Sequence, residues 1–142
     1  MASMNNLDNI VVAIDNYSDW PRINKGVVFM KLFISQGMQG KTDEDILAER
    51  NKAIEIVREM FPGNEVEVLD SFFQGEEEPA NVKASGLWLL GKSFQFLAKA
   101  DVAYFAEGWE AYRGCRLEHM ACLRYGVECI NCDGGYHGKG LE

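Results

Sequence analysis

The sequence has no apolar run long enough to cross a membrane. Its apolar stretches are shorter than the roughly 20 residues that a membrane-spanning helix needs, which argues against a membrane protein. The first residues also lack the basic start and the long apolar core of a signal peptide. We therefore expect a cytoplasmic protein.

Basic residues are scarce relative to acidic ones. The chain has 14 Lys and Arg residues against 22 Asp and Glu residues, for a net charge of -8. Because nucleic acids and anionic membranes repel such a surface, we expect neither among the partners. A local basic cluster would still allow a small anionic ligand.

Cysteine is missing from the first 114 residues, and the four that follow do not supply a metal site. Such clustering is unlike the disulfide framework of a secreted protein, so we expect reduced thiols. Cys129 and Cys132 form one CxxC motif near His137, but zinc needs a fourth ligand at regular spacing. We expect no metal and no cofactor, and we interpret "VECINC" as a strand with small side chains.

Strand-like and helix-like segments alternate along the chain. Strands are predicted over 27–35, 65–73, 101–107 and 127–132, and helices over 42–61, 86–100 and 113–126. This alternation predicts an α/β fold of the doubly wound, flavodoxin-like or Rossmann-like kind. Its sheet should be mainly parallel, with four to five strands and helices on both faces.

The length of 142 residues suits one domain, which we place at residues 30–134. Residues 1–29 form an N-terminal extension that is an extra strand (Asn9–Ile14), a lid or a segment added by cloning. Residues 135–142 are predicted to be a flexible tail.

Local signals define the first two helices. Thr42 is suited to be the N-cap of the first, with Asp45 three residues later, and Pro62-Gly63 ends it. In the second helix, four apolar residues share one face that we expect to pack on the sheet: Leu87, Leu90, Phe94 and Leu97.

Doubly wound sheets bind ligands beyond the carboxyl ends of their strands. Three loops lie there: "SQGMQG" after the first strand, "DSFF" after the second and "EGWEAYRGCRLEH" after the third. All three are polar or glycine-rich, whereas the short turns at the opposite edge show no comparable cluster of such residues. A site is therefore expected at the carboxyl edge.

The start of the third helix carries a charged cluster. Gly114 allows a tight turn, and Glu118 lies about one turn into the helix, where the helix dipole favours an ionised carboxylate. Arg113 and Arg116 either pair with Glu118 or hold a ligand phosphate. His119 points to another side and is interpreted as a packing or capping residue. A simple ion pair at the helix start is the alternative to a ligand site.

Three segments together resemble the nucleoside 2-deoxyribosyltransferase-like superfamily. They are "KLFISQGMQGKTDEDILAERNKAIEIV", "VLDSFF" and "ADVAYFAEGWEAYRGCRLEHMACLRYG". The similarity runs from about Met30 to about Cys132. Its nearest likeness is to a small branch, found in phages and Gram-positive bacteria, that is known mainly as a domain of unknown function.

The resemblance implies chemistry at an N-glycosidic bond. In the superfamily a glutamate at the position of Glu118 attacks the anomeric carbon and forms a glycosyl-enzyme intermediate. Asp70 is the candidate for the second catalytic carboxylate, and its alternative role is a turn cap with Ser71. The related enzymes are oligomers that share residues across an interface, so we expect a homodimer or a larger homo-oligomer.

The remaining candidates would bind substrate. The first loop and the two arginines suit a 5′-phosphate, and the loop aromatics suit a base, although packing is the alternative for each aromatic. The substrate-binding candidates are Ser35, Gln36, Gly37, Met38, Ser71, Phe72, Trp109, Arg113, Gly114 and Arg116, and Tyr112 and Phe73 are further aromatic candidates.

Two departures from the superfamily leave the reaction open. Phe33 replaces a tyrosine that contacts the nucleophile, and Lys92-Ser93 stands where an aspartate is usual. The sequence therefore predicts an enzyme that acts on a nucleoside or nucleoside 5′-monophosphate, by 2-deoxyribosyl transfer or by hydrolysis. A nucleotide-binding protein without turnover and a structural domain with a relic site are the alternatives.

Overall fold

The structure is a computed structural model that describes residues 28–69 and 78–137. Within these ranges five strands form one sheet in the order β2-β1-β3-β4-β5. The strands are β1 (Val28–Ser35), β2 (Asn64–Leu69), β3 (Val102–Phe105), β4 (Glu128–Asn131) and β5 (Tyr136–His137). β1 to β4 run parallel and β5 pairs antiparallel with β4, which confirms the predicted α/β fold with its mainly parallel sheet.

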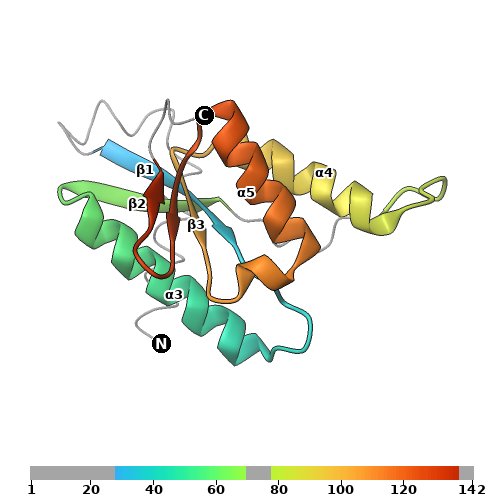
Figure 1. The fold of residues 1–142 in the computed structure, drawn as a ribbon, viewed down its shortest axis with the longest axis horizontal. Helices are drawn as coiled ribbons and strands as arrows, with labels where there is room; N and C mark the ends of the chain where they lie inside the picture. Colours follow the sequence, from blue (N-terminus) through green and yellow to red (C-terminus); the bar gives the residue numbers. More distant parts are fainter. Residues whose placement is uncertain (1–27, 70–77, 138–142) are drawn as a thin grey trace.

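Helices cover both faces of the sheet (Figure 1). The helix α3 (Asp43–Met60) lies on one face, and α4 (Ser85–Leu97) and α5 (Arg113–Tyr125) lie on the other, with the short 3-10 helix η1 (Trp109–Ala111) before α5. The chain leaves β1 toward β2 through α3 and returns through α4 to β3, on the other side of β1. The carboxyl ends of β1 and β3 therefore flank the topological switch point, where doubly wound folds bind ligands.

The predicted capping box of α3 is present. The backbone N–H of Asp45 donates to Thr42 Oγ1 at 3.1 Å, and the Asp45 side chain accepts from the backbone of Thr42. Ile46, Ala53, Ile54 and Val57 are buried, as helical spacing predicts.

Two apolar layers hold the sheet between its helices. The α3 face of the sheet supplies Leu32, Ile34, Val66, Val68, Val102, Tyr104 and Ile130 to one layer. The opposite face packs Phe33, Ala103, Phe105 and Cys129 against Leu97 and Cys122. Alternate residues of β1 point to opposite layers, as the twofold period of a strand requires.

The helix α4 departs from the prediction. Of the four residues expected to pack on the sheet, Leu97 is buried and Leu90 is half-buried, whereas Leu87 and Phe94 are exposed. Leu97 is the single buried residue that α4 contributes within the described chain. The first turns of α4 extend past the strands in Figure 1, which explains why the outer residues of the helix find no core.

The other element boundaries agree closely with those predicted, with one difference at the C-terminal end. Residues 70–73 of the predicted second strand and the predicted strand Asn9–Ile14 lie outside the described residues. Tyr136–His137 form β5, where the sequence predicted only a tail. Gly126 ends α5 in the left-handed conformation (φ 73°), a common helix stop. None of the helices in the described part of the chain is long and apolar enough to span a membrane.

Candidate active site at the carboxyl edge of the sheet

Glu118 and Ser35 meet at the switch point. Ser35 is the last residue of β1, and its Oγ donates a hydrogen bond to Glu118 Oε1 at 2.6 Å. The backbone fixes Ser35 in turn, because the N–H of Ala106 donates to its carbonyl oxygen at 2.9 Å. Both side chains are buried, with 1% of Ser35 and 7% of Glu118 exposed. The structure thus joins two of the predicted site residues that lie far apart in the sequence.

Burial controls the protonation of Glu118. Loss of hydration raises the pKa of this carboxyl group, and hydrogen bonds from the side chains of Ser35 and Ser93 partly offset the rise. We predicted a carboxylate kept ionised by the helix dipole. The net shift is opposite to the one that a helix dipole alone would give, because Glu118 lies in the second turn of α5 and desolvation by burial is the largest cause.

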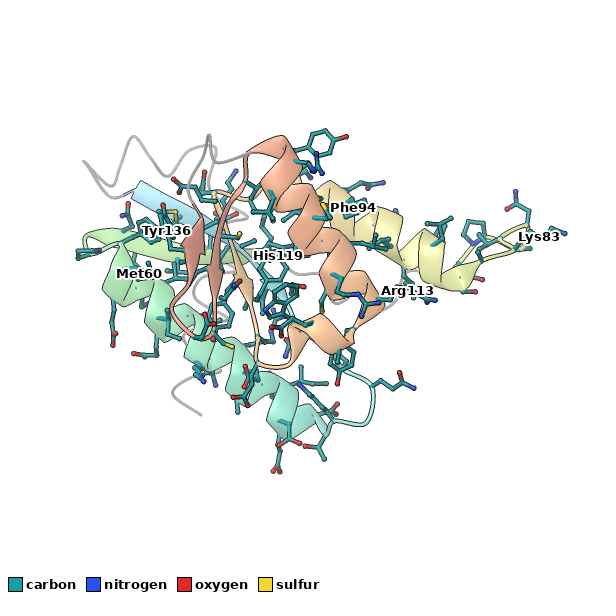
Figure 2. The ribbon with its side chains drawn as sticks, in the orientation of Figure 1. Met60, Lys83, Phe94, Arg113, His119 and Tyr136 are labelled. Atoms are coloured by element: carbon teal, nitrogen blue, oxygen red, sulfur yellow. The ribbon has the colours of Figure 1, made fainter. Side chains whose placement is uncertain are left out.

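The two arginines at the start of α5 do not pair with Glu118. Arg116 Nη1 donates to the backbone oxygen of Glu110 at 2.9 Å, which fixes η1 against α5. Arg113 lies on the α4 side of α5, with Nη2 3.2 Å from the position of a Cβ on Gly86 (Figure 2). The helix-start ion pair with Glu118 is therefore absent from the described chain, and Arg113 is exposed at the start of α5.

Cys115 adds a thiol that sequence analysis did not assign to the site. Burial is the largest effect and raises the pKa of this thiol, and the nearby Glu118 carboxylate raises it further. A hydrogen bond with Ser35 and the charge of Lys41 lower the pKa. A thiol of this kind is mostly protonated and is a poor nucleophile at neutral pH. Cys115 precedes Glu118 by three residues on α5. This spacing places both side chains on one face of a helix, and it is the sequence signal that could have assigned Cys115 to the site.

The loop after β1 packs directly against the start of α5. A Cβ on Gly37 would lie 2.1 Å from the Tyr112 ring, so only glycine admits the ring in this position. Lys41 Nζ lies 5.8 Å from the centroid of the same ring. Gln36 points to the α3 side, where its Nε2 makes a long contact of 3.4 Å with the oxygen of Ile46, and Met38 is half-buried.

Trp109 is already packed by protein. Its indole stacks on the His119 imidazole with a centroid distance of 4.2 Å, and Phe105 meets both rings. One face of Trp109 is thus covered, which leaves the other face or the ring edge for a base. His119 is a packing residue here, as one of the two interpretations predicted.

Two further expectations concern residues around this site. Gly114 is the second residue of α5, its φ is not in the left-handed region and a Cβ there would meet open space, so the turn into the helix does not require glycine. Asp70, Ser71, Phe72 and Phe73 lie outside the described residues. The part played by Asp70 therefore stays a prediction.

The side chain of Tyr104 lies on the α3 face of the sheet. The Tyr104 hydroxyl is buried without a hydrogen-bond partner in the described chain. Burial, with a smaller effect of Cys132 and Glu49, raises the pKa of Tyr104 to about 12. An unpaired buried hydroxyl is destabilising, so Tyr104 is a point of local instability beneath the carboxyl edge.

Comparisons with known proteins support the fold but do not identify a function. No family model matches the chain, and no curated protein matches it. A crystal structure of a conserved protein from Enterococcus faecalis V583 is similar, with a TM-score of 0.50 and 10% sequence identity. The match covers 73% of this chain and 63% of that protein, so this chain spans less than two thirds of its structural neighbour.

Proposed function

We propose that this protein is an enzyme that cleaves the N-glycosidic bond of a nucleoside or nucleoside 5′-monophosphate, with Glu118 as the nucleophile. The observation that carries the proposal is the burial of Glu118 at the switch point, where it is hydrogen-bonded to Ser35 and has no basic partner among residues 28–69 and 78–137. Buried carboxyl groups with a shifted pKa are frequent at functional sites. The superfamily resemblance supports the same assignment.

The proposed reaction has two steps. One carboxylate oxygen of Glu118 attacks the anomeric carbon as the bond to the base breaks, and the base leaves with the bonding electrons and takes up a proton. The resulting glycosyl ester is then attacked by water, which gives hydrolysis, or by a second base, which gives transfer. Ser35 holds Oε1, and this fixes the orientation of the attacking carboxylate.

Protonation limits this nucleophile. Since burial raises the pKa of Glu118, a larger fraction is neutral at low pH than for an exposed glutamate. Activity should therefore increase as the pH rises through this pKa. Asp70, at the end of the second strand, is the proposed second carboxylate.

A phosphate on the substrate would meet one cation from the loop after β1 and one from the start of α5. Lys41 is close enough to Cys115 to affect its pKa, and Arg113 is exposed at the start of α5. Arg116 is a weaker candidate than the sequence suggested, because one of its nitrogens is already bound to Glu110. Lys41 and Arg113 together favour a nucleoside monophosphate over a free nucleoside.

Binding of a nucleotide without turnover is the second candidate function. The raised pKa of Glu118 widens the pH range in which its carboxyl group is protonated, and a protonated carboxyl group donates a hydrogen bond to a ligand but does not attack it. We also propose a cytoplasmic protein that acts as a homodimer or larger homo-oligomer.

A matched pair of variants tests the enzyme against the binder. Wild type, Glu118→Gln and Glu110→Gln are incubated with nucleosides, deoxynucleosides and their monophosphates, with and without an acceptor base, and products are separated by chromatography. Glu110 is an exposed residue of η1 and serves as the control. We expect free base from wild type and Glu110→Gln and none from Glu118→Gln. Thermal stabilisation by a nucleotide without any base release would support the binder.

A further inference from the structure

The two cysteines of the CxxC motif lie on opposite faces of the sheet. Cys129, in β4, packs in the apolar layer on the α5 side, whereas Cys132 packs against the layer on the α3 side. An odd spacing along an extended chain gives this result, since successive side chains alternate between faces. All four cysteines of the chain are free thiols in the structure. The two thiols of the motif are therefore separated by the sheet and do not form a pair.

Cys129 pairs instead with Cys122 of α5. The side chains of these two residues are hydrogen-bonded to each other. Both are almost fully buried, with 1% of Cys122 and 0% of Cys129 exposed, and they share one apolar layer with Leu97 and Phe105. The structure thus places two thiols side by side in the core, between a helix and the strand that follows it.

The turn between α5 and β4 fixes this arrangement. The carbonyl oxygen of Cys122 accepts hydrogen bonds from the N–H groups of both Gly126 and Val127, the second at 3.0 Å. The left-handed conformation of Gly126 reverses the chain at this point. Since β4 begins directly after the turn, Cys129 is held close to Cys122 by short-range structure. The two sulfur atoms need no large movement of the chain to meet.

The shared hydrogen bond makes the two thiols chemically different. It lowers the pKa of Cys129, against the opposing effect of burial, whereas the same hydrogen bond and burial both raise the pKa of Cys122. These directions are expected when the Cys122 thiol donates to the Cys129 sulfur, because the donated proton stabilises a thiolate on Cys129. The thiolate is the reactive form of cysteine, so Cys129 is the thiol that attacks an electrophile.

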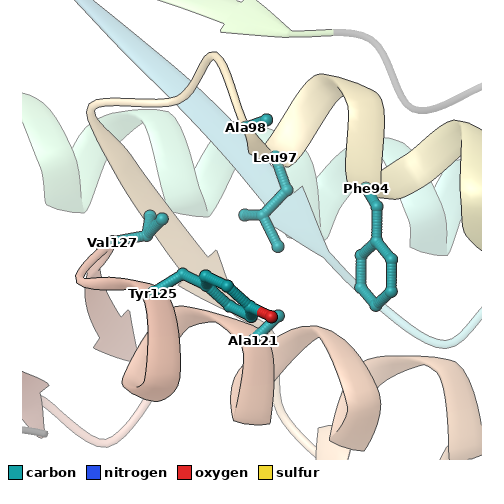
Figure 3. Close-up of a pocket in the computed structure, with 6 residues that line it drawn as sticks. All are labelled: Phe94, Leu97, Ala98, Ala121, Tyr125 and Val127. Atoms are coloured by element: carbon teal, nitrogen blue, oxygen red, sulfur yellow. The ribbon is translucent and has the colours of Figure 1, made fainter.

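A groove of about 310 Å³ between α4 and α5 leads toward the pair (Figure 3). Its lining includes Leu97, Ala121 and Val127, which belong to or pack against the layer that holds both thiols. Figure 3 shows Leu97 pointing into the groove from α4, with the Phe94 and Tyr125 rings on either side. Because this lining is almost entirely apolar, the groove favours a small uncharged oxidant, such as hydrogen peroxide, over a charged one.

We propose that Cys122 and Cys129 form a reversible disulfide when the protein meets a peroxide. The thiolate of Cys129 attacks one peroxide oxygen, the O–O bond breaks, and the leaving hydroxide takes up the proton that the thiol had released. The sulfur of Cys122 then attacks the resulting sulfenic acid, and the S–S bond forms as the S–O bond breaks. The hydroxide that leaves takes up the Cys122 proton. The two thiols thus lose two electrons, the peroxide is reduced to two waters, and a dithiol reductant reverses the bond.

The disulfide would tie α5 to the sheet close to Glu118. Cys122 follows Glu118 by one turn of the helix, and the carboxylate is near enough to contribute to the raised pKa of Cys122. A covalent link from Cys122 to β4 therefore restrains the helix that carries Glu118. An effect of oxidation on turnover rests on the function proposed above, whereas formation of the disulfide does not.

The test is disulfide mapping of the full chain after exposure to hydrogen peroxide. The remaining thiols are alkylated, and the protein is digested with trypsin without reduction and analysed by mass spectrometry. Trypsin cleaves after Arg124, so Cys122 lies on one peptide and Cys129 lies with Cys132 on another. We expect one linked species that joins Cys122 to Cys129, is lighter than its separate peptides by two hydrogen atoms, and disappears after treatment with a dithiol.

Matched variants distinguish this pair from the other thiols. Cys132→Ala should form the link as readily as wild type, because Cys132 lies on the other face of the sheet. Cys129→Ala should form no link and should leave Cys122 open to alkylation. The proposal would be overturned by a link between Cys129 and Cys132, by loss of the link in Cys132→Ala, or by a wild type in which peroxide leaves Cys122 and Cys129 unlinked.

Discussion

Gly37→Ala tests the packing of the first loop against the start of α5. A Cβ at this position would lie 2.1 Å, 2.2 Å and 2.3 Å from three atoms of the Tyr112 ring, far inside ordinary van der Waals contact. The ring must therefore move, and overpacking of this kind costs roughly 1–3 kcal/mol. The backbone itself is not the obstacle, because Gly37 has no left-handed φ. In the Tyr112→Ala background the same substitution should be neutral or stabilising by about 0.4–1 kcal/mol, because alanine restricts the unfolded chain.

Denaturant unfolding of the four proteins in this double-mutant cycle measures the coupling. We expect Gly37→Ala to lower the free energy of unfolding in the Tyr112 protein and not in the Tyr112→Ala protein. Gly114→Ala is the control for a general effect of alanine: no atom would contact its Cβ, and α5 should gain up to about 1 kcal/mol. Equal destabilisation by Gly37→Ala in both backgrounds would refute the claim that the Tyr112 ring requires glycine.

Three other substitutions test the buried polar groups. Ser35→Ala should lower the free energy of unfolding by about 1–3 kcal/mol and raise the pKa of Glu118 further, because the buried carboxyl group loses its hydrogen bond. Ser85→Ala is the control: it removes an exposed hydroxyl and should change the free energy of unfolding by less than about 1 kcal/mol. Since burial raises the pKa of Glu118, wild type should lose stability relative to Glu118→Gln as the pH rises from about 4.5 through the folded pKa. The loss should be about 1.4 kcal/mol for each tenfold difference in proton affinity between the folded and the unfolded state. The opposite trend in urea unfolding at several pH values would contradict the assignment. Tyr104→Phe removes an unpaired buried hydroxyl and should raise the melting temperature or leave it unchanged; a clear drop would show that the hydroxyl has a partner.

The fold was predictable because its local signals agree with its tertiary structure. Thr42 and Asp45 form the capping box that their spacing predicted, and the alternation of strands and helices gave the parallel sheet. The prediction for α4 failed for a physical reason. Leu87 and Phe94 have the spacing of a core face, but periodicity does not specify what a helix faces, and this helix extends past the sheet.

The candidate site was predictable in part. The resemblance selected Glu118, and the rule for doubly wound sheets selected the loop after β1. The proximity of Ser35 and Glu118 could therefore be inferred from the sequence. The contribution of Ser93 was not, because it depends on how closely α4 approaches α5. The direction of the Glu118 pKa shift was also missed, since it follows from burial, which the position of a residue in a helix does not give.

The central claim is that Glu118 forms a covalent bond to the sugar. The most direct measurement is the mass of the protein after rapid acid quenching during turnover of a deoxynucleoside monophosphate, followed by peptide mapping. We predict that part of the wild-type protein gains the mass of one sugar phosphate, located on the peptide that contains Glu118, and that Glu118→Gln gains none. Release of base by a protein that carries no such adduct, together with full activity of Glu118→Gln, would contradict the claim.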